Sequence, residues 1–133
     1  MKKRGSFTIE AALVVPMLFI VILLLIHISF FLYNRQAATA IASRGVLKGV
    51  QMETEGKASI KQEVQSFLDK EVKEKLIFVK NVDCRVDVSV TKVKVRITIV
   101  QKIPFRDLSC EVKQEMSRIH PVSFLWEMER LKK

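Results

Sequence analysis

The feature that most constrains this chain is an uninterrupted apolar segment close to its N-terminus. Ala11 to Leu32 form 22 consecutive residues without a formal charge. As a helix with a rise of ~1.5 Å per residue the segment would extend about 33 Å, which spans the hydrocarbon core of a bilayer. A buried core helix would be shorter and would be apolar on one face rather than all round. The segment therefore predicts a single transmembrane helix that contacts membrane lipid.

Three basic residues precede the apolar segment, namely Lys2, Lys3 and Arg4. Positive charge next to the first apolar helix favours retention of that end in the cytoplasm. Arg35 and Arg44 follow the segment and reduce the charge asymmetry, but a short N-terminal tail weighs more than a long domain. We therefore expect the N-terminus in the cytoplasm and the C-terminal part outside it. An ordinary secretory signal would have a shorter apolar core followed by a cleavage site of small residues.

Glu10 is a lone carboxylate that abuts the apolar segment, in the run Gly5-Ser6-Phe7-Thr8-Ile9-Glu10. A carboxylate within hydrocarbon costs a few kcal/mol, and such residues usually face a partner or a polar path. A second interpretation places Glu10 at the headgroup level, beside the basic residues and at a helix N-terminus, where negative charge is favourable. The residues alone leave both interpretations open.

At these positions the sequence resembles the type IV prepilin and pseudopilin families, and most closely the TadE-like proteins of tight-adherence (Flp-type) pilus systems. The run from Lys2 to Glu10 resembles a prepilin peptidase site with the cut after Gly5 and the glutamate fifth in the mature chain. The next six residues, Ala11-Ala12-Leu13-Val14-Val15-Pro16, resemble the Glu-x-Ala-Leu-Val-x-Pro run typical of TadE-like proteins. The resemblance is dense over residues 2–33 and weaker beyond them.

The resemblance implies that a prepilin peptidase cuts between Gly5 and Ser6 on the cytoplasmic side and leaves the helix intact. Glycine suits such a site because it does not obstruct an extended backbone in a protease cleft and resists continuing a helix. The new ammonium group on Ser6 would pair with Glu10 of a neighbouring subunit in a filament. That pairing would offset the burial of both charges.

The function implied by the resemblance is assembly rather than catalysis, in the cytoplasmic membrane of a bacterium. The chain would be a minor pilin or pseudopilin that primes, stabilises or enters an adhesive or secretion pilus. The implied partners are the prepilin peptidase, other pilin or pseudopilin subunits and, indirectly, an assembly ATPase and a membrane platform protein. No specific nucleic acid and no cofactor are expected.

Two residues within the apolar segment are unusual for a membrane helix. Pro16 removes a backbone donor, and we expect it to kink the helix, as membrane helices tolerate. His27 is interpreted as a neutral imidazole paired to the backbone or to a neighbouring helix rather than as a proton carrier or metal ligand.

Four parts follow from these features: a leader (1–5), a transmembrane helix (6–32), a helical extension (33–56) and an exported domain (57–133). In the extension, small or apolar residues recur at four-residue steps, at Ala37, Ile41, Gly45 and Gly49. Such a row permits the close approach of another element. That element is either a helix or the protein's own sheet.

The exported domain is predicted to be α+β and pilin-like. Apolar residues at three- and four-residue steps indicate an amphipathic helix over 59–78, and alternation over 82–90 and 93–99 indicates two strands that form a β-hairpin. Because Thr91-Lys92 lacks a turn-forming Gly or Asn, one long strand with a bulge is the alternative. Short helices are expected over 107–118 and 122–132.

The chain has two cysteines, Cys84 and Cys110, and both lie beyond the apolar segment. In an exported domain they would form a disulfide worth on the order of 3 kcal/mol, or they would be two separate buried thiols. Their spacing matches no zinc motif, and no metal site is predicted.

Charge and motifs restrict the remaining functions. The chain carries a net charge of +9, and its lysines alternate with glutamates in runs such as Lys70 to Lys75, as on an ordinary solvated helix. A single-pass anchor whose basic exported domain binds an anionic polymer, either cell-wall polymer or DNA, is the alternative function. No phosphate-binding loop, nucleophile elbow or zinc-protease helix occurs in the sequence, so an enzyme is not predicted.

Overall fold

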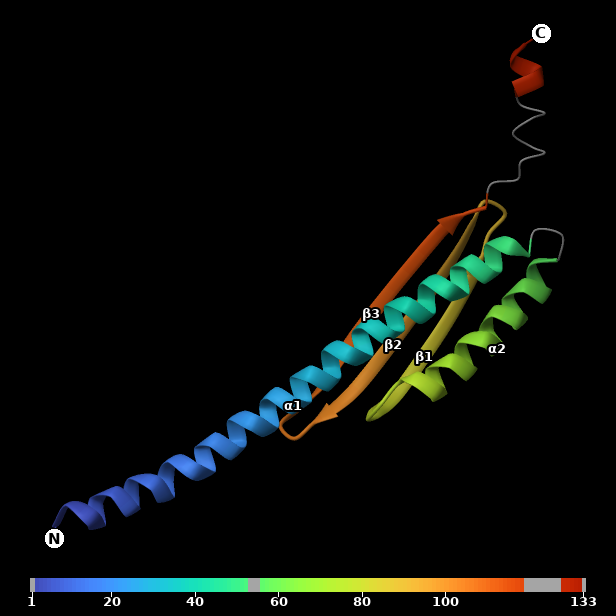
Figure 1. The fold of residues 1–133 in the computed structure, drawn as a ribbon. Coiled ribbons are helices and arrows are strands. Elements are labelled where there is room, and N and C mark those ends of the chain that lie inside the picture. The colour runs from blue at the N-terminus through green and yellow to red at the C-terminus, as the bar shows by residue number, and fades with distance from the viewer. Residues whose placement is uncertain (1, 53–55, 119–127, 133) are drawn as a thin grey trace. The chain divides into compact units, whose positions relative to one another are not determined.

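The structure is a computed structural model, and it describes residues 2–52, 56–118 and 128–132. Its elements in chain order are the helices α1 (Lys2–Gln51) and α2 (Lys57–Lys75) and the strands β1 (Val79–Val88), β2 (Lys92–Ile103) and β3 (Arg106–Ser117) (Figure 1). The chain divides into two compact units, Met1–Tyr33 and Asn34–Lys133, and α1 contributes to both.

The first unit consists of the apolar part of α1. Within the described residues, one helix, Gly5–Gln51, is long and apolar enough to cross a membrane, and its most apolar stretch has a mean hydropathy of 3.0. The apolar side chains of this stretch point outward on all sides and most are exposed. This is the pattern expected of a helix that meets lipid rather than protein.

In the second unit α1 changes character and becomes a helix with one buried face. Its buried residues recur at three- and four-residue steps: Asn34, Ala38, Ile41, Ala42, Gly45, Val46 and Gly49. Three residues of the predicted row, Ile41, Gly45 and Gly49, are on this packing face, whereas Ala37 is half-buried. The face lies against both α2 and the sheet, so the two alternatives for its partner are both correct.

The two glycines of this face are positions of close approach. A Cβ atom added to Gly45 would lie 2.8 Å from Cδ2 of Leu68 in α2. One added to Gly49 would lie 3.1 Å from Cγ1 of Val93 in β2 and 3.4 Å from Cγ2 of Val64 in α2. Glycine is needed here for the space it leaves, because the backbone of α1 is in contact with neighbouring side chains.

The predicted amphipathic helix is α2, which buries Ile60, Val64, Leu68 and Val72 on one face. It ends at Lys75 rather than at residue 78. Leu76 is extended, and Phe78 has a positive φ of 55°. Both backbone groups of Ile77, which follows Leu76, are bonded to the side chain of Asn34 in α1, as described below.

The three strands form one antiparallel sheet in the order β1-β2-β3. β1 and β2 confirm the predicted hairpin, with Val88 opposite Val93, and exclude a single bulged strand. The chain reverses at Val90 and Thr91, one residue earlier than expected, and the N–H of Ser89 donates to the carbonyl of Lys92 at 2.8 Å. The register of the hairpin places Cys84 opposite Ile97.

The prediction of a helix over 107–118 is wrong, because these residues form β3. Leu, Glu, Lys and Met favour helices in isolation, but the open edge of β2 offers a full ladder of hydrogen bonds that overrides this preference. In the ladder Cys110 lies opposite Ile99 and Val112 opposite Ile97. Of the second predicted helix, residues 128–131 are helical and residues 119–127 lie outside the described part of the chain.

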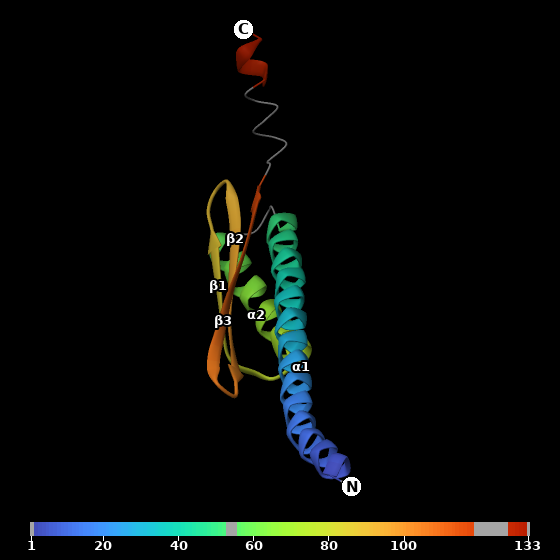
Figure 2. The same cartoon turned by 90° about the vertical axis from the view of Figure 1, so that its left-hand side faces the viewer.

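One face of the sheet is covered by α2 and the second half of α1, and the other face is open (Figure 2). The core lies between them, where inward side chains of β2 meet those of both helices. Its largest fully buried apolar residues are Ile41, Ile60, Leu68, Ile97 and Ile99. The predicted α+β class is therefore confirmed, with three strands rather than two.

Candidate functional site

Glu10 lies in α1 with its side chain exposed. The hydroxyl of Ser6, one turn earlier, donates to Oε1 of Glu10 at 3.5 Å, a long hydrogen bond. Glu10 is also the sole acidic residue of α1. Its carboxylate is therefore held loosely within its own chain and is accessible to a group from another molecule.

Gly5 lies inside α1, and a Cβ atom added to it would meet nothing within 4 Å. Glycine is expected to resist continuing a helix, but α1 begins at Lys2 and runs through Gly5. A single glycine costs a helix only about 1 kcal/mol, less than the continuing turns regain. The side chains of Lys2, Lys3 and Arg4 lie outside what the structure describes.

The polar side chains of the apolar segment bond to the helix itself. Nδ1 of His27 lies 2.7 Å from the carbonyl oxygen of Leu23, and the hydroxyl of Ser29 donates to the carbonyl of Leu25 at 2.8 Å. Backbone pairing of His27 is thus confirmed. Pro16 lies within the continuous helix, and the kink stays a prediction. Bonding to the preceding turn lets a polar group enter lipid without a partner from another chain.

Asn34 is a buried polar residue of α1 that the sequence interpretation missed. Its Nδ2 group donates to the carbonyl of Ile77 at 2.7 Å, and its Oδ1 accepts from the N–H of Ile77 at 3.1 Å. The same Nδ2 donates to Oε1 of Gln101 in β2 at 3.1 Å. One side chain thereby fastens the start of the second unit to the α2–β1 connection and to the sheet.

Asn34 and Gln101 are each 1% exposed. The burial of Gln101 could have been predicted from the alternation of β2. Gln101 occupies the next inward-facing position after Val93, Val95, Ile97 and Ile99. A polar residue at a core position implies a buried partner. The partner itself lies 67 positions away in sequence, which is why the pair was not predicted.

The open face of the sheet carries charges of both signs in neighbouring rows. Arg85 and Lys113 each lie opposite Arg96 across the sheet, an arrangement that by itself is repulsive. Carboxylates two residues away on the same face offset this repulsion. Asp83 lies 3.0 Å from Nε of Arg85. Glu111 lies 3.0 Å from Nε of Arg96 and 3.4 Å from Nζ of Lys113. Arg85, Arg96 and Lys113 are therefore each paired with a carboxylate, which weakens the case for anionic-polymer binding at this part of the face.

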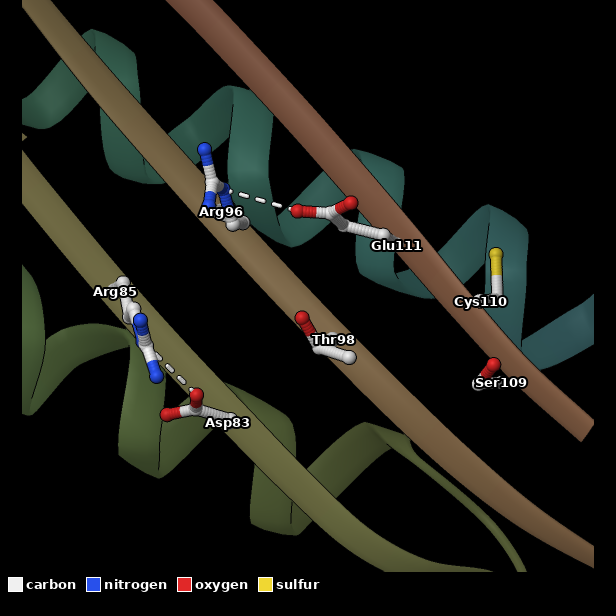
Figure 3. A pocket seen from close by; sticks show the side chains of 7 residues that line it. All are labelled: Asp83, Arg85, Arg96, Thr98, Ser109, Cys110 and Glu111. Carbon is white, nitrogen blue, oxygen red and sulfur yellow. Dashed lines mark hydrogen bonds and ion pairs between the residues drawn. The ribbon is translucent and has the colours of Figure 1, made fainter. Parts of the chain in front are cut away.

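A shallow hollow of about 430 Å³ lies on the same face (Figure 3). Its acids and bases are engaged in the ion pairs just described, and it is open to solvent. Within the described residues no group of three or more His, Cys, Asp or Glu side chains is arranged to hold a metal ion. The hollow is lined by Asp83, Arg85, Arg96, Thr98, Ser109, Cys110 and Glu111.

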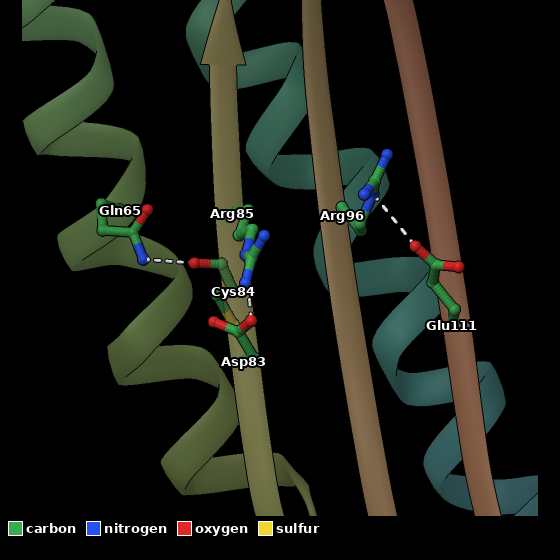
Figure 4. Close-up of polar contacts among 6 residues, drawn as sticks. All are labelled: Gln65, Asp83, Cys84, Arg85, Arg96 and Glu111. Atoms are coloured by element: carbon green, nitrogen blue, oxygen red, sulfur yellow. Dashed lines mark hydrogen bonds and ion pairs between the residues drawn. The ribbon is translucent and has the colours of Figure 1, made fainter.

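The two cysteines are free thiols, and β2 lies between the strands that carry them. In this structure the two thiols are separate, and both are half-buried rather than buried. Nε2 of Gln65 in α2 donates to the carbonyl of Cys84 at 2.8 Å and covers that edge of β1 (Figure 4). Burial, with the charges of Asp69 and Asp83, raises the pKa of the Cys84 thiol to about 11.

A long helix that is apolar all round, followed by a compact α+β unit, fits a single-pass membrane anchor with a folded domain. Among the residues at the start of α1 whose side chains the structure describes, Glu10 is the charged one, and it is exposed.

The sequence was also compared with known protein families. Residues 5–47 match the family model described as TadE-like protein, which confirms the resemblance over these residues. The match covers 43 of the 133 residues, which are the apolar part of α1 and most of its second half. No curated protein and no solved structure matches the chain.

Proposed function

We propose that this protein is a minor pilin-like subunit that takes part in assembling a tight-adherence-type pilus or a related secretion filament. It is processed after Gly5 by a prepilin peptidase, with residues 1–5 as leader and the segment from Ser6 onward as the mature anchor. Its N-terminus faces the cytoplasm and its α+β unit faces outward. An assembly ATPase and a membrane platform protein act with it, and other pilin-like subunits contact it directly.

The observation that carries this proposal is the placement of Gly5 and Glu10 within the matched segment. The two residues lie at the offset of a prepilin site, and both are accessible: Gly5 has open space around it, and the Glu10 side chain is exposed. A carboxylate at the edge of a membrane helix needs a partner when neighbouring helices bury it.

Cleavage requires a local change in α1. The bond between Gly5 and Ser6 lies in helical backbone, whereas a protease cleft takes an extended chain. Glycine makes this change easier, because it stabilises a helix by about 1 kcal/mol less than alanine does. The first turn of α1 is also where unwinding breaks the fewest hydrogen bonds.

After cleavage the ammonium of Ser6 and the carboxylate of Glu10 are opposite charges near the same end of α1. They are four residues apart, about 6 Å along the helix, so an axial offset of about one turn between parallel chains brings Ser6 of one chain level with Glu10 of the next. Each charge compensates the burial of the other. This gives Glu10 a role in joining subunits rather than in anchoring one of them.

The experiment that tests processing is mass spectrometry of the full-length protein extracted from membranes. Coexpression with an active prepilin peptidase should give chains that begin at Ser6, and an inactivated peptidase should leave Met1. Gly5→Leu should block cleavage, whereas Gly56→Leu, at a second glycine with open surroundings, should not. Chains that retain Met1 beside an active peptidase would contradict the proposal.

A second experiment separates processing from assembly. Glu10→Gln keeps the size of the side chain and removes its charge, so we expect normal cleavage and a loss of incorporation into the pilus or its assembly complex. The matched control is Glu63→Gln, which removes an exposed surface carboxylate that pairs with Lys48 at 3.0 Å. Unchanged incorporation of the Glu10→Gln variant would leave Glu10 as an interfacial charge only.

A further inference from the structure

The end of the second unit at which Asn34 lies carries exposed aromatic side chains. We call this the Asn34 end and define it as residues 34–35, 76–80 and 102–107. It comprises the entry of α1 into the unit, the α2–β1 connection and the β2–β3 turn. Phe78 is 74% exposed and Phe105 is 82% exposed, and Ile77 is also exposed.

The hydrogen bonds of Asn34 place these segments together. Asn34 bonds directly to the backbone of Ile77, the residue before Phe78, and to Gln101 in β2. Gln101 lies two residues before the β2–β3 turn, whose closing pair is Ile103 opposite Arg106. Figures 1 and 2 both show the start of β1 and the β2–β3 turn at one end of the sheet, with the β1–β2 turn at the other.

Phe78 is held outward by a backbone conformation that is unfavourable for its type. Its φ of 55° lies in the left-handed region, which bulky residues seldom adopt. Both backbone groups of the preceding Ile77 are fixed by the Asn34 amide. A strained residue that keeps a large apolar side chain in the open indicates a surface that contacts something apolar.

The position of the Asn34 end along the chain indicates that the apolar partner is the membrane. The charge-free segment ends at Leu32, two residues before Asn34, which is about 3 Å along a helix. The Asn34 end is therefore at the level where the anchor leaves the hydrocarbon. Aromatic side chains at this level are typical of the membrane interface.

The charge of the Asn34 end agrees with a lipid surface. Its three segments contain four basic residues and one acidic residue. Lys80 is paired with Asp107 at 3.0 Å, whereas no ion pair among the described residues engages Arg35, Lys102 or Arg106. On the open face of the sheet, in contrast, Arg85, Arg96 and Lys113 each pair with a carboxylate. Unpaired basic residues beside exposed aromatics fit an anionic headgroup layer.

We propose that the Asn34 end docks on the surface of the membrane, with Phe78 and Phe105 inserted into the headgroup region of anionic phospholipid. Arg35, Lys102 and Arg106 contact the lipid phosphates. This inference rests on the membrane anchor of the proposed function and adds to it a second membrane contact. The contact sets how the α+β unit stands on the bilayer before it joins other subunits.

The test uses the full chain reconstituted in vesicles of phosphatidylcholine and phosphatidylglycerol that contain brominated acyl chains. In a Trp126→Phe background, which removes the single tryptophan of the chain, one tryptophan is introduced at a time. Phe78→Trp and Phe105→Trp should each lose most of their emission to bromine quenching. Val90→Trp is the matched control, because Val90 is 58% exposed in the turn at the opposite end and should keep its emission.

A second pair of variants tests the basic residues. Lys102→Gln combined with Arg106→Gln should reduce quenching of a tryptophan at position 105, as should vesicles of phosphatidylcholine alone. Lys113→Gln, on the open sheet face, should leave it unchanged. Far-UV circular dichroism of each variant checks that the sheet is retained.

The outcomes separate this inference from the proposed function. Protein that fails to float with the vesicles would contradict the anchor, and with it the docking. Flotation without quenching at positions 78 and 105 would overturn the docking and leave the anchor intact. A blue shift that grows with protein density but occurs without quenching would assign the Asn34 end to a second copy of the chain, and would also overturn the proposal.

Discussion

Ile22 and Ile41 lie in the same helix but in opposite environments. Ile22, in the apolar part of α1, is 51% exposed, whereas Ile41, after Asn34, is 1% exposed. The first part is apolar all round and the second is apolar along one stripe that includes two glycines. One continuous helix therefore has two kinds of surface. The first half is exposed and apolar all round, as fits a lipid environment, and the second half is packed against α2 and the sheet.

The largest expected effect comes from shortening the same residue in each half. Ile41→Ala leaves a cavity in a closed core and should lower the free energy of unfolding of the α+β unit by about 2–5 kcal/mol. Ile22→Ala removes no contact of that core and should leave the value unchanged. Urea denaturation of the full chain in detergent, followed by circular dichroism, measures both. Equal losses in the two variants would contradict the division of α1.

A second comparison concerns asparagine at a buried and at an exposed position. Asn34→Ala leaves both backbone groups of Ile77 and the amide of Gln101 without their partner, and should destabilise the unit by about 1–3 kcal/mol. Asn81→Ala changes an exposed residue of β1 and should have little effect. Hydrogen exchange of the Ile77 amide should rise in the Asn34 variant alone. Retained protection of that amide would show that Asn34 does not hold the α2–β1 connection.

Two glycines of α1 also lie in different surroundings, Gly45 in the packed part and Gly5 in the exposed part. In Gly45→Ala the new methyl group would lie 2.8 Å from buried Leu68, and overpacking of about 1–3 kcal/mol outweighs the helix-propensity gain of ~1 kcal/mol. Net destabilisation of up to about 2 kcal/mol should follow. Gly5→Ala meets open space and should leave the unfolding of the unit unchanged. Thermal denaturation that is unaffected by Gly45→Ala would contradict the close packing of α1 and α2.

The smallest effect concerns the reactivity of a half-buried thiol. Because the pKa of Cys84 is raised to about 11, a Cys110→Ser variant should react with iodoacetamide slowly at neutral pH and faster as pH approaches that value. In urea the pH profile should move down to that of an ordinary thiol. Identical profiles in the native and unfolded protein would contradict the burial of Cys84.

The raised pKa of Cys84 also determines how the stability of the folded state changes with pH. Below the unfolded pKa both states keep the Cys84 proton, so the thiol does not alter stability there. As pH rises toward about 11 the unfolded state loses the proton first, and the folded state becomes less stable.

The sequence predicted those elements whose signal is local. The apolar run of α1, the stripe of α2 and the alternation of β1 and β2 each identify an element by its own periodicity. β3 was missed because Leu108, Glu111 and Met116 have helical preferences and its alternation is decided by pairing with β2. Likewise Asn34 and Gln101 form one contact that no local pattern contains. Gly5 and Glu10 were found because the resemblance fixes their spacing.

The central claim is that processing frees an ammonium at Ser6 to pair with a carboxylate of a neighbouring subunit. Zero-length carbodiimide cross-linking in membranes that contain an active prepilin peptidase, followed by peptide mass spectrometry, tests it most directly. We expect an amide bond between Glu10 of one chain and the N-terminal amine of another pilin-like chain, and its loss in the Glu10→Gln variant. Chains that keep Met1, with Glu10 free of any cross-link to a second subunit, would contradict it.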